Sequence, residues 1–507
     1  MTPTTPSAQE GPVVVTAAGA VRGVLRADGS AAFLGVPFAR PPVGPLRFAA
    51  PVPPEPWEGV RDATAYGATP LRVEDEGSLI PEPAIPGDAT LNVNVFTPRP
   101  GDADAGLPVV VWIHGGAYVA GSPASPWYDG RAFARDGVVL ASISYRLGFD
   151  GFGDIPGAPD NRGVRDWIAG LEWVRDNIAA FGGDPARVTI AGQSAGGGAV
   201  LTLLGMPAAQ HLFHAAWASS AALGDVPRSR AREHARRLAA VAGVAATREG
   251  FASVPEDRLL ALQQEAARAT DRWDRLAPAR ELLSDGGLPW APMIDGDLVP
   301  RPVPEAIAAG VGADKPLVIG ATDDEATLVT HGIAPVLRWV PAALALGALG
   351  LRSPARGRYL RASRARGTPA GAGVRRGTPA IVGRFVTDRV FRSTVARVVD
   401  ARGDAPTWVY RFAWASTATG WSTHCLDVPF LFDSLALDGV ARIAGPHPPQ
   451  AVADALHASA VDFARVGAPP WPRWDPALST ARVFGAPPGA PDLQRDPYAD
   501  TRPLLDA

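Results

Sequence analysis

The sequence contains one cysteine and one lysine among its 507 residues. A single cysteine, Cys425, cannot form a disulfide within the chain, so the fold needs no oxidising compartment, and we expect a cytoplasmic protein. Lys315 is the only lysine, so arginine is the ordinary cation of this chain. A stretch of arginines at 352–376 therefore favours a solvated helix face or loop over a nucleic-acid site.

Strong net charge and long apolar runs are also absent. The formal net charge of −3 gives no reason to expect a polyanionic partner. The longest apolar run, at 339–351, is too short to span a bilayer and contains Pro341, Gly347 and Gly350. Residues 1–12 have no basic or apolar region of the signal-peptide kind, so we expect a disordered tail there. Neither a nucleic acid nor a membrane is expected as a partner.

Buried strands and amphipathic helices alternate along the rest of the chain. Continuous apolar runs predict strands at 109–113, 138–143, 317–320 and 408–412. Apolar side chains at three- and four-residue spacing predict a helix over 164–178. This order predicts an α/β fold with a mostly parallel central sheet flanked by helices. We expect one catalytic domain at 13–507, with helical cap insertions near 228–280 and 335–386.

A possible nucleophile lies in the pentapeptide Gly192-Gln-Ser-Ala-Gly196. An apolar strand ending at Ala191 precedes it, and a helix rich in glycine and alanine follows it. In a G-x-S-x-G turn of this kind, glycines let strand and helix approach closely while the serine hydroxyl points away from the sheet. The pattern alone is weak in a glycine-rich chain, where it could be a turn with a bystander serine. It nevertheless makes Ser194 the candidate nucleophile of an α/β-hydrolase.

Serine catalysis also needs donors for the oxyanion that forms on the attacked carbonyl. Gly115 and Gly116 follow the predicted strand 109–113, and glycine leaves backbone N–H groups uncovered. With the N–H of Ala195 they would form a three-donor oxyanion hole. We expect His114, just before them, to be a structural histidine.

The base and the acid of the hydrolase should follow the nucleophile in the order serine, acid, histidine. Three adjacent carboxylates, Asp323, Asp324 and Glu325, come after the strand 317–320, and His424 comes after the strand 408–412. A histidine accepts the serine proton, and a buried carboxylate orients it. The order and spacing identify His424 as a candidate base but leave the choice among the three acids open.

The chain resembles the type-B carboxylesterases, a family that includes bacterial p-nitrobenzyl esterases and animal cholinesterases. The resemblance runs over about 21–484, and matching blocks follow in the family's order at 33–48, 89–98, 114–118, 161–166 and 181–196. In that family the acid is the glutamate of an Asp-Glu-Gly motif, which corresponds to Asp324-Glu325-Ala326 here. The family's histidine precedes a segment similar to 427–432. The resemblance therefore implies a triad of Ser194, Glu325 and His424.

The chain departs from the family pattern at three positions, and none of them is a residue of the implied triad. Ala326 replaces the glycine after the acid, Trp167 replaces a glutamine, and Thr90 stands at the position of a cysteine that pairs in secreted members. The expected function is hydrolysis of small carboxylic esters through an acyl-enzyme, by a monomer or weak homo-oligomer. No cofactor is implied, and the histidines show no metal-ligand spacing. An amidase or acyltransferase, a lipase, and a non-catalytic binding module are the alternatives.

Overall fold

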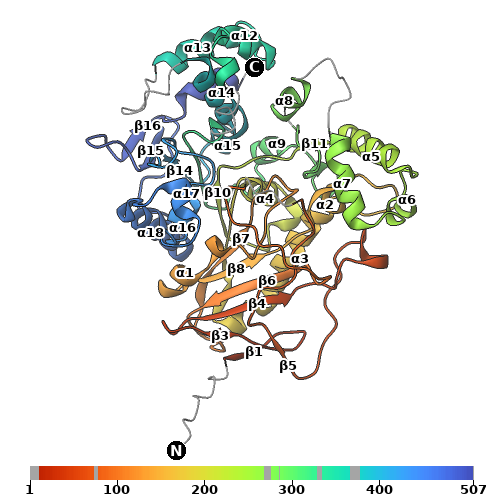
Figure 1. The fold of residues 1–507 in the computed structure, drawn as a ribbon. Helices are drawn as coiled ribbons and strands as arrows, with labels where there is room; N and C mark the ends of the chain where they lie inside the picture. Colours follow the sequence, from red (N-terminus) through yellow and green to blue (C-terminus); the bar gives the residue numbers. More distant parts are fainter. Residues whose placement is uncertain are drawn as a thin grey trace, which may run out of the picture.

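The computed structural model describes residues 11–73, 78–267, 276–284, 286–327, 334–365 and 377–505. A sheet of eleven strands runs through its centre, in the order β16-β15-β14-β13-β10-β9-β7-β8-β6-β4-β3 (Figure 1). Most of the expected N-terminal tail lies outside these residues. No helix of the described residues is long and apolar enough to span a membrane.

The middle of the sheet is parallel, and its two edges are antiparallel. The seven strands from β15 to β8 pair in parallel, whereas β3, β4 and β6 at one edge and β16 at the other pair antiparallel. The strands of this sheet are β3 Val24–Leu25, β4 Ala31–Pro37, β6 Asn92–Thr97, β7 Leu107–Ile113, β8 Val139–Ile143, β9 Gly183–Gln193, β10 Ala215–Ser219, β13 Leu317–Thr322, β14 Thr407–Phe412, β15 Thr480–Phe484 and β16 Leu493–Arg495. The predicted α/β-hydrolase architecture, with a mostly parallel sheet flanked by helices, is confirmed.

Helices cover both faces of the sheet, and strand β7 shows how. Val109, Val111 and Ile113 belong to the apolar core on one face, which also includes residues of α3 (Arg162–Asn177) and α4 (Ala195–Leu204). Val110 and Trp112 point to the opposite core, with residues of α18 (Gln450–Val466). Because successive side chains of a strand face opposite ways, burial on both faces gives the continuous apolar run seen in the sequence.

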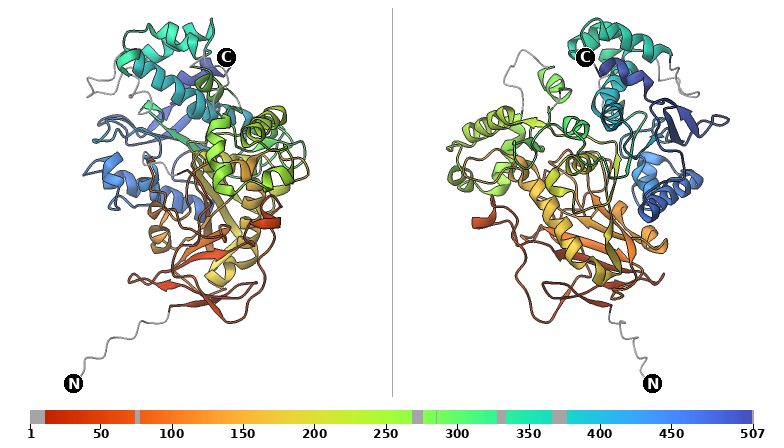
Figure 2. Two further views of the ribbon diagram at one scale, coloured as in Figure 1. Left: turned by 45° about the vertical axis from the view of Figure 1, so that its right-hand side comes forward. Right: turned by 180° about the vertical axis from the view of Figure 1, so that it is seen from behind.

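The two segments expected to form a cap contain helices that lie apart from the central sheet in Figures 1 and 2. The first carries α5 Arg228–Ala242, α6 Arg248–Ala252, α7 Glu256–Ala267 and α8 Ala277–Leu282. The second carries α11 Ala334–Leu337, α12 Ala342–Ala348, α13 Ala355–Ala365 and α14 Thr378–Thr387. A separate apolar cluster, which includes Leu283, Leu346, Leu351, Tyr359 and Phe385, joins parts of the two segments.

A π-helical turn, Asp388–Arg392, connects α14 to α15 (Ser393–Arg402). Such turns interrupt regular helices and often occur at functional sites. The remaining α-helices of the described residues are α1 Arg131–Arg135, α2 Gly148–Phe152, α9 Val303–Ala308, α16 Val428–Leu431 and α17 Val440–Ala444.

Candidate active site

Ser194 occupies the sharp turn between strand β9 and helix α4. Its backbone has φ 60° and ψ −123°, a conformation that residues with a side chain rarely adopt. Hydrogen bonds from the neighbouring strand end hold it there, since Ser194 N–H donates to the Ser219 carbonyl and Ala222 N–H donates to the Ser194 carbonyl, both at 3.0 Å. The structure therefore contains the strained serine turn that the pentapeptide predicts.

The glycines beside Ser194 allow helix α4 to pack directly on the sheet. A Cβ atom on Gly196 would lie 1.9 Å from the carbonyl oxygen of Ile113, at the end of β7. One on Gly198 would lie 2.0 Å from the carbonyl oxygen of Ala222. Both distances are far below van der Waals contact, so larger residues would push the helix away from the strands.

Ser194, His424 and Glu325 form one chain of hydrogen bonds. The Ser194 hydroxyl donates to Nε2 of His424 at 2.9 Å, and Nδ1 of His424 donates to Oε2 of Glu325 at 2.5 Å. The other carboxylate oxygen of Glu325 accepts a hydrogen bond from the backbone N–H of Thr322 at 2.8 Å. Glu325 is 3% exposed and Ser194 is 8% exposed, whereas the His424 side chain between them is 19% exposed.

The other two acids of the 323–325 loop point elsewhere. Asp323 pairs with Arg411 of β14 at 2.5 Å, and Asp324 pairs with Arg384 of α14 at 3.0 Å. Only Glu325 of the three contacts His424 among the described hydrogen bonds. The three acids lie in a bend and turn just after β13, and each of the three neighbouring carboxylates makes a different contact.

Three further side chains surround the His424 imidazole. The Phe391 ring, from the π-helical turn, lies 4.7 Å from it between ring centroids. The Gln193 amide nitrogen lies 3.3 Å from Nε2, and the Cys425 thiol donates to the Gln193 amide oxygen at 3.5 Å. Burial alone lowers the pKa of His424, but the negative charge of Glu325 and its hydrogen bond to Nδ1 outweigh it and raise the pKa well above its usual range.

Asp427 is a second buried carboxyl group near the histidine. It is 2% exposed and accepts a hydrogen bond from the Tyr410 hydroxyl at 3.3 Å. Burial, together with the negative charge of Glu325, raises the pKa of Asp427 to about 7. The group can therefore change its charge near neutral pH, a few residues from His424.

The two glycines after strand β7 lie against the serine turn. A Cβ atom on Gly115 would be 3.1 Å from Cβ of Ser194, and Gly116 has φ +115°, which favours glycine. Within the described part of the chain, no hydrogen bond uses the backbone N–H of Gly115, Gly116 or Ala195. Three free donors are thus gathered on neighbouring residues.

His114 supports this glycine loop from inside the protein. It is fully buried, stacks on Tyr145 with 4.5 Å between ring centroids, and its Nδ1 donates to the Gly115 carbonyl at 2.8 Å. Burial lowers the pKa of His114 to about 4, so the ring is neutral at pH 7. These contacts agree with the expected structural role.

A cavity of about 990 Å³ opens onto Ser194 and His424. Most of its lining is apolar and comes from 222–227, 282–305 and 386–397, and of the segments expected to form a cap only Leu282 of α8 and Val386 of α14 take part. The apolar side chains that line it include Leu223, Leu283, Leu288, Ile294, Val390 and Phe391. The cavity can hold a small organic molecule with its polar bond beside the serine hydroxyl.

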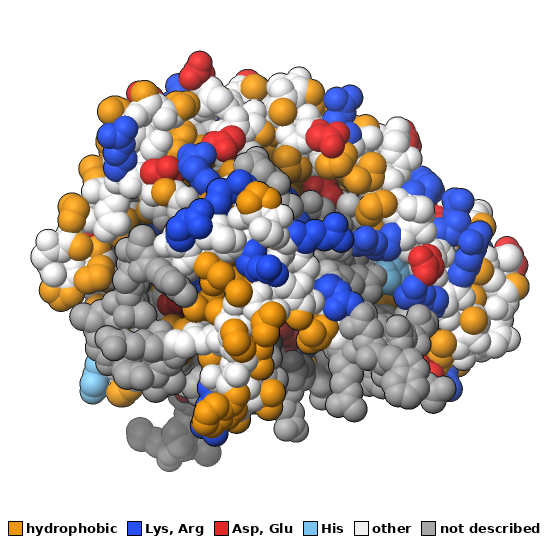
Figure 3. All heavy atoms as spheres, turned by 90° about the horizontal axis from the view of Figure 1, so that it is seen from above, with side chains coloured by type: hydrophobic (Ala, Val, Ile, Leu, Met, Phe, Trp, Pro, Cys, Tyr) orange, Lys and Arg blue, Asp and Glu red, His pale blue; other side chains and the backbone are white. Residues whose placement is uncertain are grey.

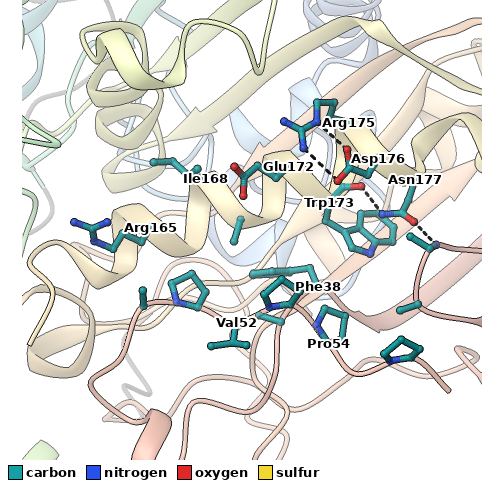
Figure 4. A pocket seen from close by; sticks show the side chains of 18 residues that line it. Phe38, Val52, Pro54, Arg165, Ile168, Glu172, Trp173, Arg175, Asp176 and Asn177 are labelled. Carbon is teal, nitrogen blue, oxygen red and sulfur yellow. Dashed lines mark hydrogen bonds and ion pairs between the residues drawn. The ribbon is translucent and has the colours of Figure 1, made fainter.

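A second cavity, of about 510 Å³, lies between α3 and the N-terminal loops (Figure 4). Phe38 and Trp173 line it together with several prolines, while Glu172 and Arg175 of α3 are at its edge. Neither Ser194 nor His424 lines this cavity. In the described parts of the chain, no cluster of three or more His, Cys, Asp or Glu residues could hold a metal ion.

Sequence reasoning left several of these neighbours without a role. Gln193 occupies a variable position of the G-x-S-x-G pattern, Arg384 lies in a segment expected only to be a cap, and Phe391 lies just beyond that segment. No local pattern marks them, because their contacts with the site arise from the packing of α14 and the π-helical turn. Asp427 belongs to the segment 427–432, and the resemblance of that segment to the family was the sequence signal that could have pointed to this residue.

Comparison with known proteins agrees with this geometry. A family model described as the carboxylesterase family matches residues 10–343. The para-nitrobenzyl esterase of Bacillus subtilis is 35% identical over 97% of this chain and 98% of the relative. The phenmedipham hydrolase of Pseudarthrobacter oxydans is 34% identical over 97% of this chain and 99% of the relative.

Solved structures show the same likeness in three dimensions. A carboxylesterase of Geobacillus stearothermophilus, solved at pH 6.2, superposes with a TM-score of 0.82 and 32% identity, over 97% of this chain and 99% of that one. A p-nitrobenzyl esterase structure superposes with a TM-score of 0.79 and 30% identity, over 97% and 98% of the two chains. Sequence and fold together place this chain in the carboxylesterase family, as a serine hydrolase of carboxylic esters.

Proposed function

We propose that Ser194, His424 and Glu325 are the catalytic triad of this esterase. The observation that carries the proposal is the continuous hydrogen-bond chain from the serine hydroxyl through the imidazole to a buried carboxylate. A serine hydroxyl is a weak nucleophile at neutral pH, and an adjacent base makes it reactive. The carboxylate keeps the proton on Nδ1, so that Nε2 is free to accept the serine proton.

In the first step, the Ser194 oxygen attacks the ester carbonyl while its proton moves to Nε2 of His424. The carbonyl oxygen becomes an oxyanion, and the free N–H groups of Gly115, Gly116 and Ala195 are the donors that we infer for it. His424 then gives its proton to the departing alcohol, leaving an acyl-serine. Glu325 stabilises the imidazolium that exists between these two transfers.

In the second step, water attacks the acyl-serine with the same histidine as base. The proton passes from water to His424 and then to the Ser194 oxygen as the carboxylic acid leaves. Donors to the oxyanion contribute through charge stabilisation in a site from which water is largely excluded. His424 is one of the two partners in every proton transfer of this scheme.

The cavity supports a small, largely apolar ester as substrate. Its volume of about 990 Å³ suits molecules of drug-like size, and its apolar walls favour an aliphatic or aromatic group on either side of the ester. The relatives' names refer to p-nitrobenzyl esters and to phenmedipham, so aromatic esters are a reasonable first substrate class for this chain.

The single cysteine supports a cytoplasmic location. A monomer or weak homo-oligomer stays a prediction.

A substrate panel tests the proposed class. We expect hydrolysis of p-nitrophenyl acetate, butyrate and octanoate, with kcat/KM falling at palmitate because a cavity of fixed volume limits the acyl chain. Chelators should leave the rates unchanged. Rates that continue to rise to palmitate, or that increase sharply at an oil–water interface, would instead identify a lipase.

A further inference from the structure

The second cap segment has a charge composition unlike the rest of the chain. Residues 326–387 contain ten of the 48 basic side chains of the protein and none of its 51 acidic ones. The whole chain is slightly negative, so this part is a local positive region on a protein of the opposite net sign. The described helices α11 to α14 all lie within it.

Large apolar side chains are exposed in the same place. Val336 is 71% exposed, Trp339 is 78% exposed and Leu344 is 65% exposed. Helix α12 has no polar residue in its sequence, yet only part of it contributes to the apolar cluster beneath, through Ala345 and Leu346. A helix that is apolar on every side normally has a partner on every side.

Exposed arginines lie in the same cap segment as these apolar side chains. The Arg338 guanidinium lies 5.2 Å from the centre of the Trp339 ring. Arg352, Arg358 and Arg361, in and just before α13, are also exposed. Figure 3, which looks onto this end of the molecule, shows apolar and basic side chains next to one another. We name the surface formed by Val336, Trp339, Leu344 and these four arginines the cap surface.

We propose that the cap surface docks on an anionic phospholipid surface. Trp and aliphatic side chains enter the interfacial region of a bilayer, while arginines around them attract acidic headgroups. The contact is peripheral, and so differs from the membrane span that no described helix could provide. It departs from the expectation, drawn from net charge and apolar runs, that no membrane takes part.

Two other partners fit these observations less well. A nucleic acid would pair with the arginines but would leave Val336 and Leu344 without a favourable contact, because base stacking uses aromatic rings. A second copy of this chain could cover the apolar side chains, but it would bring two sets of arginines together. A bilayer with acidic lipids satisfies the apolar and the basic side chains at once.

The position of the cap surface connects docking with the active site. Leu283 belongs to the apolar cluster that includes Leu346 of α12, and it also lines the cavity at Ser194. The docked protein would therefore have its active-site cavity close to the lipid surface. Docking itself requires no catalysis, so the two properties can be tested separately.

Co-sedimentation of the full chain with vesicles tests the proposal. We expect binding to vesicles of phosphatidylserine and phosphatidylcholine, weak binding to phosphatidylcholine alone, and loss of binding in about 1 M salt, where the Debye length is about 3 Å. The triple variant Arg352→Glu/Arg358→Glu/Arg361→Glu should bind on the order of a hundredfold more weakly, from roughly fivefold per arginine. Trp339→Ser/Leu344→Ser should lose at least about tenfold.

Matched variants on other parts of the surface are the controls. Arg61→Glu/Arg495→Glu removes two other exposed arginines, and Val466→Ser removes an apolar side chain that is 75% exposed. These controls should bind vesicles like the natural chain. All variants should hydrolyse p-nitrophenyl acetate at the natural rate without lipid, which shows that they are folded.

Several results would overturn the proposal. The first is that the natural chain does not bind phosphatidylserine vesicles. The second is that the triple arginine variant binds them as well as the natural chain does. Tighter binding to double-stranded DNA than to vesicles would identify the nucleic acid as the partner. Self-association that Trp339→Ser/Leu344→Ser abolishes, with no vesicle binding, would identify a second copy.

Discussion

Arg384 of helix α14 donates a hydrogen bond to Asp324, the residue before Glu325, at 3.0 Å. The second oxygen of Asp324 accepts a hydrogen bond from the backbone N–H of Ser422, two residues before His424, at 3.3 Å. One carboxylate thus joins the cap segment, the loop of the acid and the segment of the histidine. The Ala326 N–H, which donates to the Thr387 hydroxyl of α14 at 3.1 Å, adds a second connection.

These contacts separate the roles of the two neighbouring acids. Glu325→Gln should lower kcat on p-nitrophenyl acetate by about 10³-fold or more, because a neutral amide cannot stabilise the imidazolium. Asp324→Asn should lower kcat far less, but should reduce the free energy of unfolding by about 2–3 kcal/mol, since it removes the negative charge that pairs with the largely buried Arg384 at 3.0 Å. Steady-state kinetics and urea unfolding measure the two effects. Equal losses of kcat would leave the acid unassigned.

The raised pKa of His424 gives a pH dependence with a definite sign. Only the neutral imidazole can accept the Ser194 proton, so kcat/KM should fall as pH falls through the pKa of His424. Because that pKa lies above its usual range, activity should increase toward alkaline pH. Glu325→Gln removes a negative charge beside the ring, so the pKa should decrease and the acid limb of the profile should move to lower pH.

Asp427 needs its own control in this experiment, because its pKa is also near 7. Asp427→Asn should keep an acid limb, since the base is His424. If the limb disappeared in Asp427→Asn, or moved to higher pH in Glu325→Gln, the profile would report a group other than the proposed base.

Gly196, the second glycine of the pentapeptide around Ser194, should tolerate no side chain. Gly196→Ala would force a methyl group to within 1.9 Å of the Ile113 carbonyl oxygen, so α4 and the serine turn must move. We expect at least about 1–3 kcal/mol of destabilisation and a large loss of kcat. Gly357→Ala in helix α13 is the matched control, since its nearest neighbour is a flexible arginine end at 3.6 Å. A stable, active Gly196→Ala variant would contradict the close packing described for this turn.

Much of the fold could be predicted from the sequence because its signals are local. The continuous apolar runs at β7, β8, β13 and β14 reflect burial on both faces of the sheet, and the glycines around Ser194 reflect one tight turn. The antiparallel edge strands β3 and β16 are short, so they leave little pattern. Sheet order also depends on pairing between distant strands, which local patterns do not specify.

The candidate site shows the same limit. The order of serine, acid and histidine could be predicted, but the choice among Asp323, Asp324 and Glu325 came from resemblance alone. In the structure Asp323 pairs with Arg411 and Asp324 pairs with Arg384, so Glu325 is the acid that remains for His424. Both arginines are distant in sequence from the acids, so no spacing in the sequence reveals these pairs.

The most direct test of the account is covalent labelling of the nucleophile. A phosphonylating inhibitor, followed by proteolysis and mass spectrometry, should label Ser194 at one equivalent per chain. Ser194→Ala should abolish labelling and lower kcat by at least about 10³-fold. Ser219 and Ser220 lie nearby but are 1% and 0% exposed, and the Ser219 hydroxyl lies 2.9 Å from the Tyr410 hydroxyl oxygen, so neither should react. Labelling of either serine in place of Ser194 would contradict the proposed mechanism.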